Sequence, residues 1–237
     1  MTFGSLFSGI GGMDLGLERA GMVCKWQVEI DPFCQKVLAK HWPGVKRYGD
    51  IRTVTGLEHV DVIAGGFPCQ DVSVAGKRCG ITGPRSGLWA EYFRIICQTR
   101  PRFVLVENVS GLLMGGGIQR VLGDLASIRM DAEWNIISAA HLGAFHHRPR
   151  VFILAYANSN RRHSCLLLNR VLLKDEFRDD YKLHYSADGR VLRPVPKSRV
   201  FSVADGFSSG LDSLRGAGNA VCPPVAEWIG RRIMETA

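Results

Sequence analysis

The feature that most constrains the fold is a regular alternation of two apolar patterns over the first 157 residues. Runs rich in β-branched and aromatic residues occur at 2–7, 23–29, 60–64, 103–106, 134–139 and 151–155. Helical periodicity lies between several of them, at 12–20, 32–41, 87–99 and 118–129. This alternation predicts an α/β fold with a mostly parallel sheet and helices on both faces. The last two runs have no helical pattern between them, so we expect them to pair as an antiparallel hairpin at the sheet edge.

The composition changes after residue 157. Between residues 158 and 200 there are ten basic and five acidic residues, which give five of the eight net positive charges of the chain. Such a stretch favours a polyanionic partner, although a plain solvated surface is the alternative. Apolar character returns near the end, where 223–233 predicts a helix with proline in its first turn. We therefore expect a catalytic and cofactor-binding domain of residues 1–157 and 206–237, with a small basic lobe at 158–205 inserted in it.

The seven cysteines are odd in number and form no C-x-x-C pair. This argues against a disulfide framework and against a thiolate zinc site, and favours a reducing compartment. No apolar run reaches the roughly 18–20 residues that span a bilayer, and the N-terminal residues lack the pattern of a secretory signal. We expect a cytoplasmic protein that binds neither a membrane nor a metal.

A glycine-rich turn follows the first predicted strand, from Phe7 to Gly12, and Glu29 ends the next strand. Glycines at a strand-to-helix turn let a ligand approach the backbone, and an acid about 20 residues later can accept hydrogen bonds from ribose hydroxyls. The pair indicates a nucleoside-containing cofactor and leaves a dinucleotide and S-adenosylmethionine both open. A tight turn without a ligand is the structural alternative.

Cys69 follows Gly65-Gly66-Phe67-Pro68 at the end of the 60–64 run. Ligands of open α/β sheets bind outside the carboxyl ends of the strands. The rigid proline and a nearby helix N-terminus would favour the thiolate of Cys69, so we interpret it as a nucleophile rather than as a buried core residue. The following stretch, 71–87, is punctuated by glycines and basic residues, which is typical of a lid that closes over an anionic substrate. An inert exposed loop is the alternative.

Two further groups are candidates for the same site. Glu107 follows the apolar run 103–106, so we expect partial burial to raise the pKa of its carboxyl. A solvated strand-end glutamate is the alternative. Arg148 and Arg150 are two residues apart at the start of the last run and can point at one anionic target. The adjacent His146 and His147 would point to opposite faces, which disfavours a metal site.

Taken in order, these segments resemble the DNA cytosine carbon-5 methyltransferases, in a small form with a shortened target-recognition region. The resemblance covers about residues 3–157 and 211–235. It rests on Phe-Ser-Gly-Ile-Gly-Gly at 7–12, Gly-Asp-Ile at 49–51, Phe-Pro-Cys-Gln at 67–70, Glu-Asn-Val at 107–109, Arg-x-Arg at 148–150 and Gly-Asn-Ala-Val at 218–221. It implies a Rossmann-like S-adenosylmethionine-dependent methyltransferase fold and methyl transfer to carbon 5 of a cytosine flipped out of duplex DNA.

The resemblance also implies a role for each catalytic residue. Cys69 would attack carbon 6 of the cytosine, and Glu107 in its protonated form would hold ring nitrogen 3. Carbon 5 would then become the nucleophile that accepts the methyl group, which is covalent catalysis. Arg150 would orient Glu107 and the base, with Arg148 close by.

The remaining implied contacts divide between cofactor and DNA. S-adenosylmethionine would be bound by the glycine turn, by Glu29 on the ribose, by Ile30, Asp50 and Ile51 around the adenine, and by residues that close the pocket. The full cofactor set is Phe7, Ser8, Gly9, Ile10, Gly11, Gly12, Glu29, Ile30, Asp50, Ile51, Pro68, Leu88, Asn219, Ala220 and Val221. The expected DNA contacts are Gln70, Ser73, Lys77, Arg78, Arg85, Arg161, Arg162, Lys197 and Arg199. The resemblance further implies a bacterial or phage-encoded monomer that acts on double-stranded DNA, and it leaves open whether a cognate restriction endonuclease accompanies the enzyme or the enzyme acts as an orphan.

Two departures from the family pattern keep alternatives open. His146 stands where the family usually has glutamine, and the target-recognition region, about 158–202, is far shorter than usual. An RNA cytosine methyltransferase on the same core is one alternative, although the lobe offers no clear stacking platform for single strands. A catalytically degenerate DNA-binding relative is another. A nicotinamide-dependent oxidoreductase would explain the glycine turn and Glu29, but not the Pro-Cys-Gln turn or the arginine pair.

Overall fold

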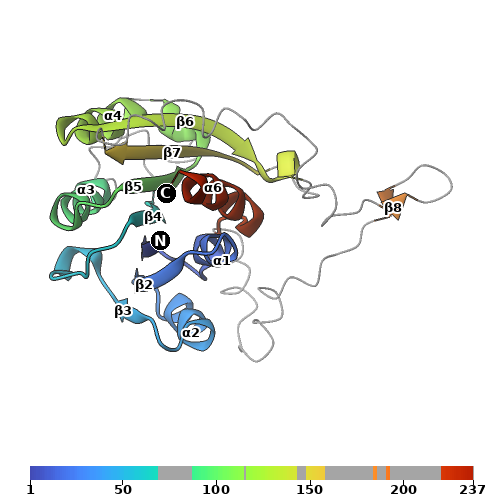
Figure 1. Ribbon diagram of the computed structural model, residues 1–237, viewed down its shortest axis with the longest axis horizontal. Coiled ribbons are helices and arrows are strands. Elements are labelled where there is room, and N and C mark those ends of the chain that lie inside the picture. The colour runs from blue at the N-terminus through green and yellow to red at the C-terminus, as the bar shows by residue number, and fades with distance from the viewer. Residues whose placement is uncertain are drawn as a thin grey trace.

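The computed structural model describes residues 1–68, 87–114, 116–142, 148–157 and 220–236, together with the backbone of 184–185 and 191–192. Its centre is a seven-stranded sheet of order β3-β2-β1-β4-β5-β7-β6, shown in Figure 1. The strands are β1 (Thr2–Leu6), β2 (Val23–Val28), β3 (Lys46–Tyr48), β4 (Val62–Gly66), β5 (Phe103–Asn108), β6 (Met130–Ser138) and β7 (Pro149–Ala157). The short strands β8 (His184–Tyr185) and β9 (Val191–Leu192) form a separate antiparallel pair.

Strands β3, β2, β1, β4 and β5 are parallel to one another, whereas β7 is antiparallel to both of its neighbours, β5 and β6. The predicted edge hairpin is therefore confirmed. The reason is the short connection between β6 and β7, of which the structure describes the 3-10 helix η4 (Ala139–Leu142). Parallel strands need a crossover of a dozen or more residues, and this connection is too short for one.

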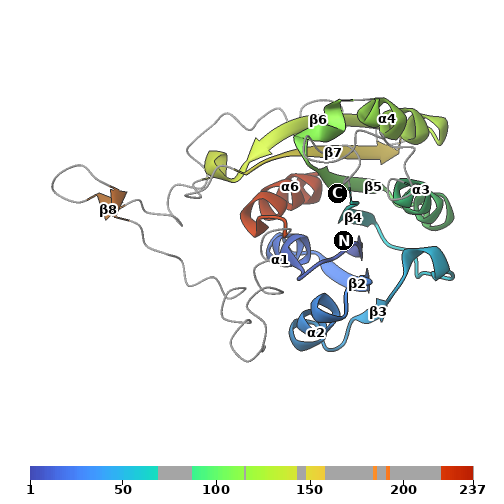
Figure 2. The same cartoon turned by 180° about the vertical axis from the view of Figure 1, so that it is seen from behind.

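The helices lie on both faces of the sheet, as Figures 1 and 2 show. One face is covered by α3 (Leu88–Thr99) and α4 (Gly117–Ser127), and the other by α1 (Gly12–Arg19) and α6 (Pro223–Glu235), with α2 (Pro32–His41) beside α1. The first layer buries Trp89 and Ile95 against Val104 and Val106 of β5. This doubly covered, mostly parallel sheet confirms the predicted α/β methyltransferase fold.

Helix α2 shows how closely local sequence can set an element. Asp31 precedes it in extended conformation, and its carboxylate accepts hydrogen bonds from the backbone N–H groups of Phe33 and Cys34. Pro32 occupies the first helical position, where its missing N–H leaves no bond unmade. The predicted and observed bounds of α2 are the same, 32–41.

The C-terminal helix α6 packs directly on α1 because glycines let the two backbones meet. A Cβ atom on Gly16 would lie 2.5 Å from the Cβ of Ala226 and 2.7 Å from the amide nitrogen of Glu227. A Cβ on Gly12 would collide with the carbonyl oxygen of Val221. Two segments at opposite ends of the sequence are thereby joined beside the glycine turn. The boundary of the inserted lobe lies outside the described residues.

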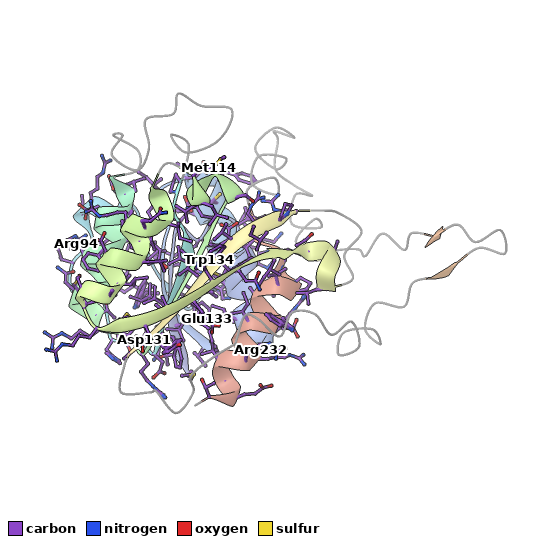
Figure 3. All side chains as sticks on the ribbon, turned by 90° about the horizontal axis from the view of Figure 1, so that it is seen from above. Arg94, Met114, Asp131, Glu133, Trp134 and Arg232 are labelled. Carbon is purple, nitrogen blue, oxygen red and sulfur yellow. The ribbon has the colours of Figure 1, made fainter. Side chains whose placement is uncertain are left out.

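The sheet edges differ most from the sequence prediction. The structure adds β3, a three-residue strand with little apolar character, and starts β6 at Met130, four residues before the predicted run. Continuous pairing of Met130 with Ala157 through Ser138 with Pro149 sets the length of β6, so β7 acts as its template. Figure 3 shows Asp131, Glu133 and Trp134 along this edge strand, and the Trp134 side chain is 43% exposed.

Within the described part of the chain, no helix combines the length and apolar character that crossing a membrane would require.

Candidate active site

The site is built around Glu107 near the carboxyl end of β5. Its register neighbours are Gly66 on β4 and Phe152 on β7, and only 8% of the residue is exposed. One carboxylate oxygen, Oε1, lies 3.0 Å from Nε of Arg150, which stands at the start of β7. Because β7 runs antiparallel to β5, the beginning of β7 meets the end of β5. The fold thus joins two of the predicted catalytic residues that are 43 positions apart.

Burial dominates the electrostatics of Glu107. Desolvation raises the pKa of its carboxyl above the ordinary value, while Arg150 and Arg148 act in the opposite direction. The predicted rise of the pKa is therefore confirmed. A buried carboxyl with a raised pKa can donate a hydrogen bond to a ring nitrogen nearer to neutral pH than a solvated one can.

Arg148 contributes a second guanidinium next to Glu107. Its Nε and Nη2 atoms are buried and have no hydrogen-bond acceptor among the described residues. Burial and the neighbouring Arg150 lower the pKa of Arg148, and Glu107 raises it. Buried N–H groups without acceptors cost free energy, so these two atoms require an acceptor from outside the described residues. Among the described residues, Cys222 also interacts electrostatically with Arg148, and burial raises the pKa of its thiol.

The segment that leads to Cys69 starts beside the carboxyl of Glu107. A Cβ on Gly66 would lie 2.5 Å from Oε2 of Glu107, so only glycine permits this approach. The buried Asn108 side chain donates a hydrogen bond from Nδ2 to the carbonyl oxygen of Phe67, 3.0 Å away. This bond fixes the backbone two residues before Cys69. The predicted cofactor residue Pro68 is half-buried at the same point. Cys69 itself lies outside the described residues.

The glycine turn between β1 and α1 has a strained backbone that hydrogen bonds hold in place. Phe7, Gly9 and Gly11 have positive φ angles of 54°, 56° and 85°, which glycine tolerates and phenylalanine rarely adopts. The Gly11 N–H donates to the carbonyl of Ser8, 2.9 Å away. A Cβ on Gly9 would meet no atom of the described residues within 4 Å, so within this part of the chain nothing covers its backbone. Gly12 begins α1, and Ile10 is buried in a small cluster with Val37 of α2.

Glu29 and Ile30 form the neighbouring wall at the carboxyl end of β2. The Glu29 carboxylate accepts hydrogen bonds from the backbone N–H of Gly9, at 2.7 Å, and of Asp31, at 2.8 Å. Burial raises the pKa of Glu29, although these bonds act against the rise. Ile30 is 60% exposed, so it offers an apolar surface beside the polar turn. Open backbone, an anchored carboxylate and an exposed apolar surface together fit a nucleoside ligand.

The third wall follows β3 and contains the predicted cofactor residues Asp50 and Ile51. Asp50 begins the 3-10 helix η1 (Ile51–Thr53), and Oδ2 of its carboxylate is 2.6 Å from Nη2 of Arg52, which lowers the pKa of Asp50. The Ile51 side chain is only 3% exposed and belongs to the hydrophobic core. Ile51 can therefore serve a ligand through its backbone, whereas its side chain serves packing. Leu88, the first residue of α3, packs against the same core.

A buried polar cluster beneath the glycine turn was not foreseen from the sequence. Asp14 of α1 is fully buried and accepts hydrogen bonds from Oγ of Ser5, at 3.0 Å, and from Nε2 of Gln27, at 3.1 Å. Burial raises the pKa of Asp14 to about 6. The cluster links β1, α1 and β2 directly behind the turn. The only sequence signal was an acidic residue on the apolar side of a short helix.

Other predicted residues fall on parts of the chain that the structure does not describe. They are Cys69, Gln70, Ser73, Lys77, Arg78, Arg85, His146, Arg161, Arg162, Lys197, Arg199 and Asn219. Ala220 and Val221 are described, and the Val221 carbonyl rests on Gly12 next to the glycine turn. Within the described ranges, no group of three or more His, Cys, Asp or Glu side chains could hold a metal ion.

The family model of C-5 cytosine-specific DNA methylases matches residues 1–188. The chain belongs to this family. Among curated relatives of the family, the Type II methyltransferase M2.BsuMI of Bacillus subtilis is 39% identical over 158 residues, covering 64% of this chain and 41% of that protein. The Type II methyltransferase M.HgiBI of Herpetosiphon aurantiacus is 36% identical over 207 residues, covering 85% of this chain and 45% of that protein. The chain thus spans less than half the length of these two methylases.

Solved structures agree with the fold of this methylase chain. The structure described as a DNA modification methyltransferase encoded within an E. coli prophage has a TM-score of 0.59 and 26% identity, covering 67% of this chain and 47% of that one. The S. pombe Dnmt2 methyltransferase has a TM-score of 0.57 and 22% identity, covering 67% of this chain and 51% of that one. At this identity the second likeness supports the fold alone.

Proposed function

We propose that this chain transfers a methyl group from S-adenosylmethionine to carbon 5 of cytosine in duplex DNA. The observation that carries the proposal is the buried Glu107–Arg150 pair, which lies beside the strand end that leads into Cys69, in a chain of the cytosine methylase family. The names of the curated relatives support a methyltransferase of the Type II class. Because the chain matches less than half the length of those relatives, the activity of this chain by itself is the point to test.

In the proposed mechanism, the thiolate of Cys69 forms a bond to carbon 6 of the flipped cytosine. The protonated carboxyl of Glu107 donates a hydrogen bond to ring nitrogen 3 and stabilises the electron density that moves into the ring. Arg150 holds the Glu107 carboxyl in place. The cofactor supplies an electrophilic sulfonium methyl group. Carbon 5 takes this group, loses its proton to solvent, and the bond to Cys69 breaks to restore the aromatic ring.

The cofactor is proposed to lie over the glycine turn, where the structure offers the three walls described above. No atom of the described residues covers the backbone at Gly9, Glu29 is anchored beside it, and Ile30 is exposed. These groups would hold the ribose and one face of the adenine. Val221 rests on Gly12, so α6 would close the far end of the pocket.

The DNA grip is proposed to be the basic lobe at 158–205, together with the basic stretch after Cys69. Support comes from charge alone, because phosphate contacts need lysine and arginine and these segments are rich in both. A restriction endonuclease of the same specificity is the partner that the Type II relatives suggest. In that arrangement, methylation by this chain would protect the host DNA.

The decisive experiment incubates the purified chain with S-adenosylmethionine and duplex DNA, and then maps the modified bases by bisulfite sequencing. We expect protected cytosines within one short sequence context. Cys69→Ser should abolish the protection, whereas Cys97→Ser, at an exposed cysteine of α3, should retain it. Methylation of transfer RNA but not of duplex DNA would replace the proposed substrate, and the absence of methyl transfer to either nucleic acid would refute the activity.

A further inference from the structure

Arg94 connects helix α3 to the 3-10 helix η1 by hydrogen bonds to its backbone. Its Nη2 donates to the carbonyl oxygen of Ile51, 2.8 Å away, and its Nη1 donates to the carbonyl oxygen of Val54, 3.1 Å away. Figures 1 and 2 show the segment after β3 beside α3, and Figure 3 shows Arg94 on this flank of the molecule. The interaction bridges more than 40 positions of sequence.

The guanidinium is itself held in place by neighbours on α3. Its Nε lies 2.7 Å from Oε2 of Glu91, one turn earlier, and its Nη1 lies 3.0 Å from Oε1 of Gln98, one turn later. Planar donor groups that are fixed at both ends lose little further entropy when they bind acceptors. The Arg94 guanidinium is therefore held in a fixed position on α3, unlike a mobile surface side chain.

Helix η1 needs hydrogen-bond donors from outside because a single 3-10 turn satisfies few of its own carbonyl groups. The Asp50 carboxylate caps its start by accepting a hydrogen bond from the backbone N–H of Arg52, 3.0 Å away. At its other end, the bond from the Val54 N–H to the Ile51 carbonyl is long, at 3.4 Å. The shorter bond from Arg94 is thus the stronger partner of the Ile51 carbonyl.

The position of η1 matters for the proposed cofactor pocket. Strand β3 pairs with β2 in parallel, so the carboxyl ends of the two strands lie side by side. Asp50 follows β3 there, and Glu29 and Ile30 follow β2. The Glu29 N–H donates to the carbonyl of Tyr48, 3.0 Å away, which holds the two strand ends together. Helix η1 therefore starts at the same end of the sheet at which the exposed Ile30 side chain follows β2.

We propose that Arg94 is a positioning residue for cofactor binding, which fixes the Asp50–Ile51 backbone against the adenine end of S-adenosylmethionine without touching it. This inference rests on the proposed cofactor site. It concerns binding rather than chemistry, because in the described part of the chain Arg94 donates to side chains of α3 and to the carbonyls of Ile51 and Val54, and not to the Glu107 carboxyl. Its loss should weaken the ground-state affinity for the cofactor and leave the rate at saturation nearly unchanged.

The test measures the binding of S-adenosylhomocysteine by titration calorimetry, together with KM and kcat for methyl transfer to DNA. Arg94→Met keeps the aliphatic stem but removes all the donors, and Arg94→Lys can reach only one carbonyl at a time. We expect Arg94→Met to raise both the Kd for S-adenosylhomocysteine and the KM for S-adenosylmethionine about 10-fold, which corresponds to about 1.4 kcal/mol. Arg94→Lys should fall between this variant and the wild type.

The matched control is Arg120→Met. Arg120 forms an ion pair of the same kind within α4, with its Nε 2.7 Å from Oδ2 of Asp124, one turn away. This variant should bind S-adenosylhomocysteine like the wild type. If Arg94→Met keeps the wild-type Kd and KM, or if it lowers only the binding stoichiometry through unfolding, Arg94 has no positioning role and the inference fails. If the wild-type chain binds no S-adenosylhomocysteine, the proposed cofactor site is refuted, and the inference about Arg94, which depends on that site, is refuted as well.

Discussion

Replacing Arg150 by methionine should lower the free energy of unfolding by the cost of leaving a charged Glu107 carboxylate buried without a partner. The Nε of Arg150 lies 3.0 Å from the carboxylate, and the side chains are 23% and 11% exposed. At an effective dielectric constant of about 20, the attraction at this distance is about 5 kcal/mol. Desolvation of the pair and the partial exposure of Arg150 offset much of this, which leaves about 1–3 kcal/mol of stability.

The loss should depend on pH. Burial already places the pKa of Glu107 above its ordinary value, and losing the cation should raise it further because the attraction of Arg150 lowers it. A carboxyl whose pKa is higher in the folded state contributes stability that is complete below its unfolded pKa of about 4.3 and that disappears as the pH rises through the folded pKa. The penalty of Arg150→Met should therefore be small near pH 4.5 and full near pH 8.

Urea unfolding at a series of pH values measures this effect. Adding Glu107→Gln to Arg150→Met removes the unpaired charge and should recover most of the lost stability at pH 8, without restoring methyl transfer. Arg120→Met, at the exposed pair with Asp124 on α4, should change the free energy of unfolding by less than about 1 kcal/mol at any pH. A penalty for Arg150→Met that is equal at pH 4.5 and pH 8, or that persists in the double variant, would refute the reasoning.

Three further predictions concern the scaffold and the DNA grip. Gly16→Ala should destabilise the fold by about 1–3 kcal/mol because its Cβ would press on α6. Gly123→Ala on α4 should stabilise the fold by about 0.5–1 kcal/mol, because the added Cβ would meet no described atom within 4 Å. Urea unfolding midpoints in the opposite order would contradict this packing. Asp14, whose pKa is raised to about 6, should cost stability on the order of 2–3 kcal/mol as the pH rises from about 4 to above 6, and Asp14→Asn should flatten this slope in the same assay. DNA affinity should fall steeply with salt, and neutralising four basic residues of the lobe should reduce the slope of log K against log salt by about 3–4; an unchanged slope would show that the lobe is not the grip. The four residues are Arg161, Arg162, Lys197 and Arg199.

Local sequence predicted those parts of the fold whose causes are themselves local. The α2 bounds follow from Asp31 as cap and Pro32 at the first position, and the hairpin follows from the short connection before Arg148. Strand β3 and the first half of β6 were missed because their residues are strands only by pairing, with β2 and β7 respectively. No periodicity in a single segment carries that information.

The candidate site shows the same division. The burial of Glu107 could be predicted because the apolar run before it had to enter the sheet. The roles of Arg94, Asp14 and Ile51 could not, since each depends on partners from other elements. The contact of Ile51 with the adenine edge stays a prediction, and the structure adds that its side chain belongs to the hydrophobic core.

The central claim is tested most directly by a duplex that carries 5-fluorocytosine at the target cytosine. Fluorine cannot leave carbon 5 as a proton does, so the enzyme should be trapped on its substrate after methyl transfer. We expect a covalent protein–DNA complex that is stable in denaturing gel electrophoresis, requires S-adenosylmethionine, and is lost in Cys69→Ser. An adduct that still forms in Cys69→Ser, or a wild-type chain that methylates the natural duplex yet leaves no adduct, would contradict the account.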